Sequence, residues 1–199
     1  MTRVYTAAVI GAGAGGSLSM AGLAASERFE LRGVADMRQQ ALDDARARYP
    51  DIQTFTSYQQ LFEQCPVDVV CVSTWASSHL EITRAALELP LTGILVEKPL
   101  ADNSRDGQTV IECVRAKNLP MVTPHNLLVL PHVREITQQI RSGEIGELRL
   151  IEIECSGWDI INAGIHWLNF ALVLIHGDPV ETVMAAIDSS TRTYRDGMQ

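Results

Sequence analysis

The chain has 199 residues, 46% hydrophobic and 20% charged, a composition that supports a buried core and disfavours disorder. Its formal net charge is −8 and it has no run of Lys or Arg, which disfavours a nucleic-acid partner because neutralising phosphates takes clustered basic side chains. The cysteines form no CxxC pair, so we expect reduced thiols in a cytoplasmic protein and no metal site. They are Cys65, Cys71, Cys113 and Cys155.

The first long uncharged stretch runs from Thr6 to Ala25. Three interpretations compete for it: a signal peptide, a membrane span and a loop that holds phosphate. Glycines interrupt the stretch at Gly11, Gly13, Gly15, Gly16 and Gly22. Each interior glycine costs a helix about 1 kcal/mol relative to alanine, so we favour the loop and expect no membrane association.

The stretch begins with a short apolar strand, Thr6 to Ile10, and continues as a small-residue helix to Ser26. Between them, residues 11–16 match GxGxxG. In this pattern Gly11 permits the tight turn, Gly13 lets the backbone approach a pyrophosphate, and Gly16 lets helix and strand pack together. The first N–H groups of the helix then face the phosphates.

A second strand, Glu30 to Ala35, is followed by Asp36. This acid comes about twenty residues after the glycine motif, where a carboxylate accepts both hydroxyls of the adenosine ribose. Asp36 also repels a 2′-phosphate, which favours NAD. Arg38 either reaches such a phosphate or lies in solvent on the next helix, which leaves NADP open.

Helices and strands keep alternating after Asp36. We expect helices at 37–49, from the N-cap Ser57 to 64, from an N-cap at Ser77 or Ser78 to 89, and at 104–117. We expect strands at 52–55, 67–74, 93–96 and 120–123. This order predicts an α/β fold with a doubly wound parallel sheet, a dinucleotide-binding domain that occupies residues 1–123.

The pattern changes after residue 123. We expect helices at 131–141 and 162–175, a long strand within 143–155 and another strand at 180–188. Residues 124–199 would thus form a second domain of helices and strands. So few elements shield each other poorly. The second domain is therefore expected to be incomplete in this chain, or covered by a partner.

Polar residues follow two of the buried strands, at the sheet edge where open α/β folds bind ligands. Ser73 and Thr74 are expected to contact the ribose beside the nicotinamide, or simply to form a turn with a serine cap. His79, one turn into the next helix, faces either the cofactor or solvent. Glu97 and Lys98 follow the neighbouring strand and are also predicted to contact the cofactor.

Lys98 precedes Pro99, which restricts its backbone and leaves a cis bond open. Its ammonium is a compact donor for a substrate hydroxyl or carbonyl oxygen, although a surface lysine before a turn proline has the same sequence. Asn162 and His166 lie four residues apart on the last predicted helix, hence on one face. A histidine there can accept the proton of a bound alcohol, or can be a core residue of an apolar helix.

These residues together resemble the Gfo/Idh/MocA oxidoreductases, the family of glucose–fructose oxidoreductase and inositol dehydrogenase. The resemblance runs through VIGAGAGG, VAD, VSTWASSH, ILVEKPLA, RSGEIGELR, NAGIHWLNF and GDPVETVMA. It implies an N-terminal Rossmann domain followed by an α/β domain with an open, mainly antiparallel sheet. It also implies hydride transfer between NAD(P) and a sugar, polyol or related alcohol, and a homo-oligomer.

Carried over from the family, Lys98 binds and polarises the reacting oxygen and His166 exchanges the hydroxyl proton. Many members have Asp where this chain has the neutral Asn162, which cannot raise the basicity of a histidine by charge. The loop from Cys155 to Asn162 is shorter than is common in the family, and strands of the open sheet are missing, so we expect a partial chain. Two other functions stay open: a dinucleotide sensor without catalysis, and a lyase or glycosidase that oxidises its substrate transiently.

Overall fold

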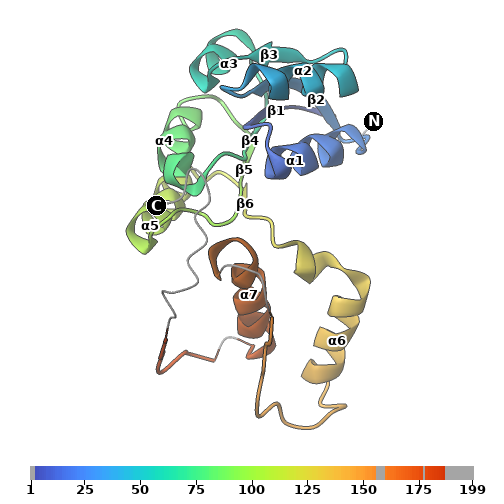
Figure 1. Ribbon diagram of the computed structural model, residues 1–199, viewed down its shortest axis with the longest axis vertical. Coiled ribbons are helices and arrows are strands. Elements are labelled where there is room, and N and C mark those ends of the chain that lie inside the picture. Colours follow the sequence, from blue (N-terminus) through green and yellow to red (C-terminus); the bar gives the residue numbers. More distant parts are fainter. Residues whose placement is uncertain (1–2, 156–159, 177, 187–199) are drawn as a thin grey trace. The chain divides into compact units, whose positions relative to one another are not determined.

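The structure, a computed structural model, describes residues 3–155, 160–176 and 178–186 (Figure 1). The chain divides into two compact units, Met1–Pro124 and His125–Gln199. Within the described ranges, no helix combines the length and the apolar character needed to cross a membrane.

The first unit is built on a six-stranded sheet whose strand order is β3-β2-β1-β4-β5-β6. All neighbouring strands are parallel. The strands are β1 (Tyr5–Ile10), β2 (Phe29–Ala35), β3 (Gln53–Phe55), β4 (Val69–Val72), β5 (Gly93–Val96) and β6 (Met121–Val122). The chain fills the sheet outward from β1 in one direction, then returns and continues from β4 in the other. The predicted doubly wound parallel sheet is confirmed.

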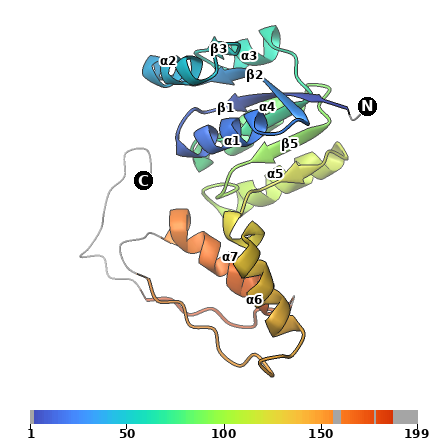
Figure 2. The ribbon, with the colours of Figure 1, turned by 90° about the vertical axis from the view of Figure 1, so that its right-hand side faces the viewer.

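Helices cover both faces of this sheet (Figures 1 and 2). Helices α1 and α2 pack on one face, through a core that includes Met20, Leu23 and Leu42. Helices α3, α4 and α5 pack on the other, through Leu61, Ile82 and Val114 among others. Their bounds are α1 (Ala14–Ala24), α2 (Gln39–Arg48), α3 (Tyr58–Gln64), α4 (Ala76–Ala86) and α5 (Ser104–Ala116).

The two-residue period of β1 explains how one strand serves both cores. Ala7 and Val9 point to the core beneath α1 and α2, whereas Ala8 and Ile10 point to the opposite core. All four are at most 3% exposed. A strand buried on both faces must be apolar at every position, which is why the sequence from Thr6 to Ile10 shows no polar alternation.

The helix caps match the sequence in one case and differ in another. Ser57 caps α3 as predicted, because its hydroxyl accepts a hydrogen bond from the backbone N–H of Gln60. The cap expected at Ser77 or Ser78 is wrong, since α4 begins earlier and its N-cap is Trp75. The Ser78 hydroxyl instead donates to the carbonyl of Trp75 within the first turn.

The second unit contains helical elements only, within its described residues. A 3₁₀ turn, η1 (Asn126–Val129), precedes α6 (Pro131–Arg141), which matches the predicted helix. A π-helical turn, η2 (Ile160–Gly164), runs directly into α7 (Ile165–Leu174). The expectation of one α-helix from 162 to 175 is therefore wrong at its start, because residues 162–164 belong to the π turn.

The strands expected within 143–155 and at 180–188 are not found. No residue of 143–155 or 180–186 is in a strand, and 187–188 lie outside the described residues. Apolar side chains of these segments are exposed, with Leu150 at 76% and Met184 at 91%. A strand exists only when a neighbouring strand takes its backbone hydrogen bonds, and the described part of this unit supplies no such neighbour.

Candidate cofactor site

The candidate site lies where β1, β2, β4 and β5 end. Three backbone hydrogen bonds continue the sheet ladder past these ends: Gly11 N–H to Ala35, Ser73 N–H to Ile10, and Glu97 N–H to Val72. They hold the residues that follow the strands side by side at one edge. The edge includes the point between β1 and β4 where the strand order reverses, which is the ligand-binding position of open α/β sheets.

Gly11 and Gly16 are required by the backbone around them. Gly11 has a φ of +94°, and a Cβ there would lie 2.6 Å from the carbonyl oxygen of Ser73. A Cβ on Gly16 would lie 1.8 Å from the carbonyl oxygen of Gly11. The turn and the start of α1 therefore fit together only without side chains, as the GxGxxG pattern predicts.

Gly13 and Gly15 differ from this pair. A Cβ on Gly13 would meet no protein atom closer than a guanidinium nitrogen of Arg38, at 3.9 Å, so its backbone stays open to a ligand. Gly13 is also the N-cap of α1 and makes no side-chain cap hydrogen bond. Gly15, which the sequence analysis did not select, would place a Cβ 3.3 Å from the side chain of Glu97. The additional glycine in GAGAGG is the sequence feature that could have indicated this close contact.

Asp36 is tied to the glycine loop and to Arg38. One carboxylate oxygen accepts the backbone N–H of Ala12 at 2.8 Å and the Arg38 Nη2 at 3.0 Å. The other accepts the backbone N–H of Arg38 at 2.8 Å and its Nε at 3.0 Å. Burial alone would raise the pKa of Asp36, but the hydrogen bonds from Arg38 and Ala12 outweigh it and the net pKa is lowered. Arg38, expected either to reach a 2′-phosphate or to lie in solvent, has a side chain that is 66% exposed and paired with Asp36.

The loop after β4 is held against the first helix. Ser73 is buried, and its hydroxyl lies 3.3 Å from the Ser19 hydroxyl of α1. The Thr74 hydroxyl lies 2.8 Å from that of Ser78. Trp75 follows them with 53% of its surface exposed. Ser73 and Thr74 thus follow β4 at the sheet edge next to the glycine loop, and their contact with the ribose beside the nicotinamide stays a prediction.

His79 faces neither solvent nor the crevice. Its side chain is fully buried, with Nε2 lying 3.1 Å from the carbonyl oxygen of Thr74 and Nδ1 3.3 Å from that of Leu100. Burial lowers the pKa of His79, although the two carbonyls and that of Pro99 favour its protonated form. Both sequence interpretations of this residue, cofactor contact and solvent exposure, are therefore corrected.

Glu97 and Lys98 follow β5 beside the glycine loop. Glu97 packs against Gly15 and accepts the backbone N–H of Lys98 at 3.0 Å. Burial raises the pKa of the Glu97 carboxyl. The Lys98–Pro99 bond is cis, the alternative that the sequence left open. Lys98 is half-buried at the same sheet edge as Ser73 and Asp36.

The second unit holds the other two predicted site residues, Asn162 in the π turn and His166 in α7. Both are half-buried. His166 makes an edge-to-face contact with His125, with 5.4 Å between ring centroids. His125 was missed by the sequence analysis, although it stands two residues after the predicted strand 120–123. The convergence of Lys98 and His166 on one substrate stays a prediction.

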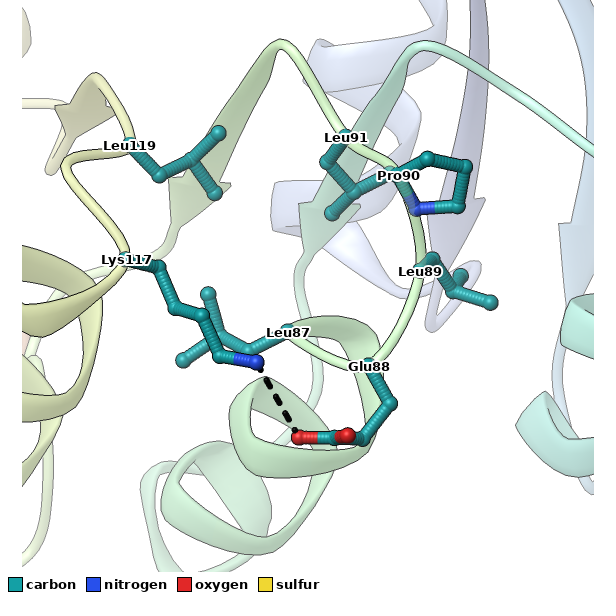
Figure 3. Close-up of a pocket in the computed structure, with 7 residues that line it drawn as sticks. All are labelled: Leu87, Glu88, Leu89, Pro90, Leu91, Lys117 and Leu119. Atoms are coloured by element: carbon teal, nitrogen blue, oxygen red, sulfur yellow. Dashed lines mark hydrogen bonds and ion pairs between the residues drawn. The ribbon is translucent and has the colours of Figure 1, made fainter.

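A shallow apolar pocket of about 310 Å³ lies elsewhere, beside the start of β5 (Figure 3). Four leucines line it, and Lys117 pairs with Glu88 across its rim at 3.5 Å. It opens at the amino ends of the strands, opposite the glycine loop, so it is not part of the candidate site. In the ranges that the structure covers, no cluster of three or more His, Cys, Asp or Glu side chains is arranged to hold a metal ion.

Comparison with known proteins identifies the class to which this site belongs. The model of the Gfo/Idh/MocA family, described as an oxidoreductase family with an NAD-binding Rossmann fold, matches residues 5–125. The chain belongs to this family. Its first unit is the NAD-binding Rossmann fold, and the glycine loop, the open backbone at Gly13 and the carboxylate of Asp36 fit a dinucleotide.

Two curated relatives align with most of the chain at low sequence identity. The 1,5-anhydro-D-fructose reductase of Ensifer adhaerens is 27% identical over 165 residues, which cover 74% of this chain and 49% of that protein. The myo-inositol 2-dehydrogenase of Thermotoga maritima is 23% identical over 190 residues, covering 89% and 56%. The chain therefore spans about half the length of these relatives.

A solved structure shows the same fold. The apo scyllo-inositol dehydrogenase of Lactobacillus casei superimposes with a TM-score of 0.78 at 17% identity, covering 87% of this chain and 56% of that one.

Proposed function

We propose that the protein is an NAD(P)-dependent oxidoreductase that acts on a sugar, a polyol or a related alcohol. The observation that carries this proposal is the shared sheet edge, where Asp36 is bonded to the glycine loop and that loop lies against Glu97, the neighbour of Lys98. The names of relatives support the substrate class, because one reduces 1,5-anhydro-D-fructose and another oxidises myo-inositol.

In this proposal two residues of the chain act on the substrate. When bound, the nicotinamide supplies the site that accepts or gives the hydride. Lys98 donates a hydrogen bond from its ammonium to the reacting oxygen and stabilises negative charge there. His166 takes the hydroxyl proton during oxidation and returns it during reduction, and Asn162 orients the imidazole.

Both NAD and NADP are accepted in this proposal, with NAD preferred. Asp36 favours a free 2′-hydroxyl, and Arg38, which is paired with it, offsets the charge that would otherwise repel a 2′-phosphate. A homo-oligomer and a cytoplasmic location belong to the same proposal. The support is the family resemblance for the first and four free thiols, all within the described residues, for the second.

The test is a panel of polyols and sugars assayed with NAD⁺ and NADP⁺ at 340 nm on the full chain. Lys98→Met and His166→Ala should each lower kcat by about 100-fold or more. Lys117→Met and His132→Ala are matched controls, because both residues are exposed and outside the candidate site, and should leave kcat unchanged.

Three outcomes would overturn the proposal. Unchanged activity in Lys98→Met and His166→Ala would remove their catalytic roles. Tight NADH binding without turnover of any alcohol would favour the sensor. Product formed without net NADH would favour a lyase or glycosidase that returns its hydride.

A further inference from the structure

The loops that follow β4 and β5 are joined by one buried side chain. His79 lies in the first turns of α4, and none of its surface is exposed. Its two ring nitrogens face the carbonyl oxygens of Thr74 and Leu100, at 3.1 and 3.3 Å. Thr74 comes two residues after β4, and Leu100 follows the cis bond between Lys98 and Pro99. One imidazole thus bridges the two loops that stand beside the crevice.

These two loops belong to the nicotinamide side of the site. Asp36, which receives the adenosine ribose, follows β2 on one side of β1, whereas Thr74 and Lys98 follow β4 and β5 on the other. A dinucleotide whose pyrophosphate rests on the glycine loop therefore extends its nicotinamide toward Thr74 and Lys98. The bridge made by His79 is confined to that half.

The bridge requires a side chain that donates hydrogen bonds. Carbonyl oxygens accept hydrogen bonds and cannot donate them, so a hydrogen bond at either contact takes its proton from the ring. Burying a carbonyl without a hydrogen-bond donor costs free energy, so the hydrogen bond from the ring stabilises its position between the loops. A neutral ring carries one N–H and donates to only one of the two carbonyls at a time, whereas an imidazolium donates to both. An apolar ring of similar size fills the space but donates nothing.

We propose that His79 is a positioning residue, which fixes the Lys98–Pro99–Leu100 loop against Thr74 and so sets Lys98 for the nicotinamide end of the cofactor. It does not touch the cofactor itself. Its effect on cofactor binding rests on the proposed function, whereas its effect on the loop does not.

The first experiment measures the loop directly. Amide hydrogen exchange over residues 97–103 of the full chain is compared in wild type, His79→Phe and Thr83→Val. Exchange should be about tenfold faster in His79→Phe, since opening the loop no longer breaks the bridge. Thr83→Val is the matched control: Thr83 is on the same helix and equally buried, and its hydroxyl has no hydrogen-bond partner among the described residues. Its exchange should match wild type.

The second experiment separates the two halves of the cofactor. NADH and ADP-ribose, which lacks nicotinamide, are titrated against the same variants. His79→Phe should raise the Kd of NADH about tenfold and change that of ADP-ribose less than about twofold. His79→Gln should recover affinity to within about threefold of wild type, because its carboxamide N–H donates to a carbonyl.

The exchange measurement tests the role of His79 by itself, whereas the NADH titration also depends on the proposed function. Unchanged loop exchange in His79→Phe, or equal weakening of NADH and ADP-ribose, overturns the positioning role. If His79→Phe does not fold, His79→Leu, which also donates no hydrogen bond, takes its place in the exchange measurement, and wild-type exchange in that variant overturns it. Wild type that binds no NADH counts against the proposed function, and the exchange result still decides the role of His79.

Discussion

The guanidinium of Arg38 binds both carboxylate oxygens of Asp36, through Nε and Nη2 at 3.0 Å each. With the N–H groups of Ala12 and of Arg38 itself, each oxygen of Asp36 already accepts two hydrogen bonds. A ribose diol that binds Asp36 must therefore displace the guanidinium. A 2′-phosphate can instead meet the remaining N–H groups of Arg38 while the pair stays intact.

This competition predicts opposite effects of Arg38→Ala on the two coenzymes. The Kd of NADPH should rise about tenfold, because a charged donor to the 2′-phosphate is lost. The Kd of NADH should stay the same or fall by about threefold, since the ribose then no longer has to displace the guanidinium from Asp36. Fluorescence titration of both coenzymes measures the effect.

Arg32→Ala is the matched control for that titration. Arg32 forms the same two-pronged pair with Glu30, also two residues away, but on the exposed first half of β2. It should change neither Kd by more than about twofold. Equal weakening of NADH and NADPH by Arg38→Ala would show that Arg38 supports the fold of the loop and does not select the coenzyme.

Two glycines of α1 should respond to alanine in opposite directions. Gly16→Ala places a Cβ 1.8 Å from a carbonyl oxygen of the turn, and should lower the free energy of unfolding by about 3 kcal/mol. Gly22→Ala meets no atom within 4 Å, and should raise it by up to about 1 kcal/mol through helix propensity. Urea denaturation measures the free energy of unfolding of both variants. If Gly16→Ala is as stable as Gly22→Ala, the close approach of turn and helix is contradicted.

Asp68 should make the stability of the first unit depend on pH. It accepts the backbone and hydroxyl hydrogens of Thr6 and pairs with Arg3 at 2.8 Å. The contacts with Thr6 lower the pKa of Asp68 below its ordinary 3.8; burial opposes them, and the pairing with Arg3 adds a further lowering. A carboxyl whose folded pKa is lowered stabilises the protein above its unfolded pKa, and this contribution is lost as the pH falls through the folded pKa.

Asp68→Ala should therefore lower the free energy of unfolding by about 1 to 2 kcal/mol at pH 7. The difference from wild type should shrink once the pH drops below 3.8, the ordinary value for aspartate. Glu30→Gln, which removes an exposed pair, should cost less than about 0.5 kcal/mol at pH 7. A difference for Asp68→Ala that stays constant from pH 7 to the acid transition would exclude this network as its source.

The four thiols should react in the order of their exposure. Cys155 is exposed and Cys113 half-buried, whereas Cys65 and Cys71 are at most 3% exposed. Burial, and then the nearby Glu97, raises the pKa of Cys71 to about 12. Iodoacetamide at pH 8 should label Cys155 first and leave Cys65 and Cys71 unlabelled until the protein unfolds, as peptide mass spectrometry can follow. Early labelling of Cys71 in the native protein would contradict its place in the sheet.

The sequence was most informative where a residue's environment is local. Strand β5 and helix α6 lie where they were predicted, because a short apolar run and a helical repeat of apolar residues each indicate burial from local sequence alone. The need for glycine in the turn could also be predicted. Gly16 is constrained by the nearby backbone of Gly11, and Gly11 by the backbone of Ser73, which follows the neighbouring strand.

The errors arise where distant segments decide the outcome. The burial of His79 follows from Leu100, twenty-one residues later, reaching the same ring as Thr74. Nothing in VSTWASSH indicates that contact. The segments around Leu150 and Val183 have strand-like composition, but a strand requires a hydrogen-bonding neighbour, and composition does not specify one.

The order of the strands keeps apart the residues proposed to choose the coenzyme and the lysine proposed to contact the reacting oxygen. Asp36 and Arg38, to which we assign the choice of coenzyme, follow β2, and Lys98, to which we assign the reacting oxygen, follows β5, with β1 and β4 between them. On that proposal, substitutions at Asp36 and Arg38 change which reduced-nucleotide pool of the cell the protein draws on without touching the loop that carries Lys98.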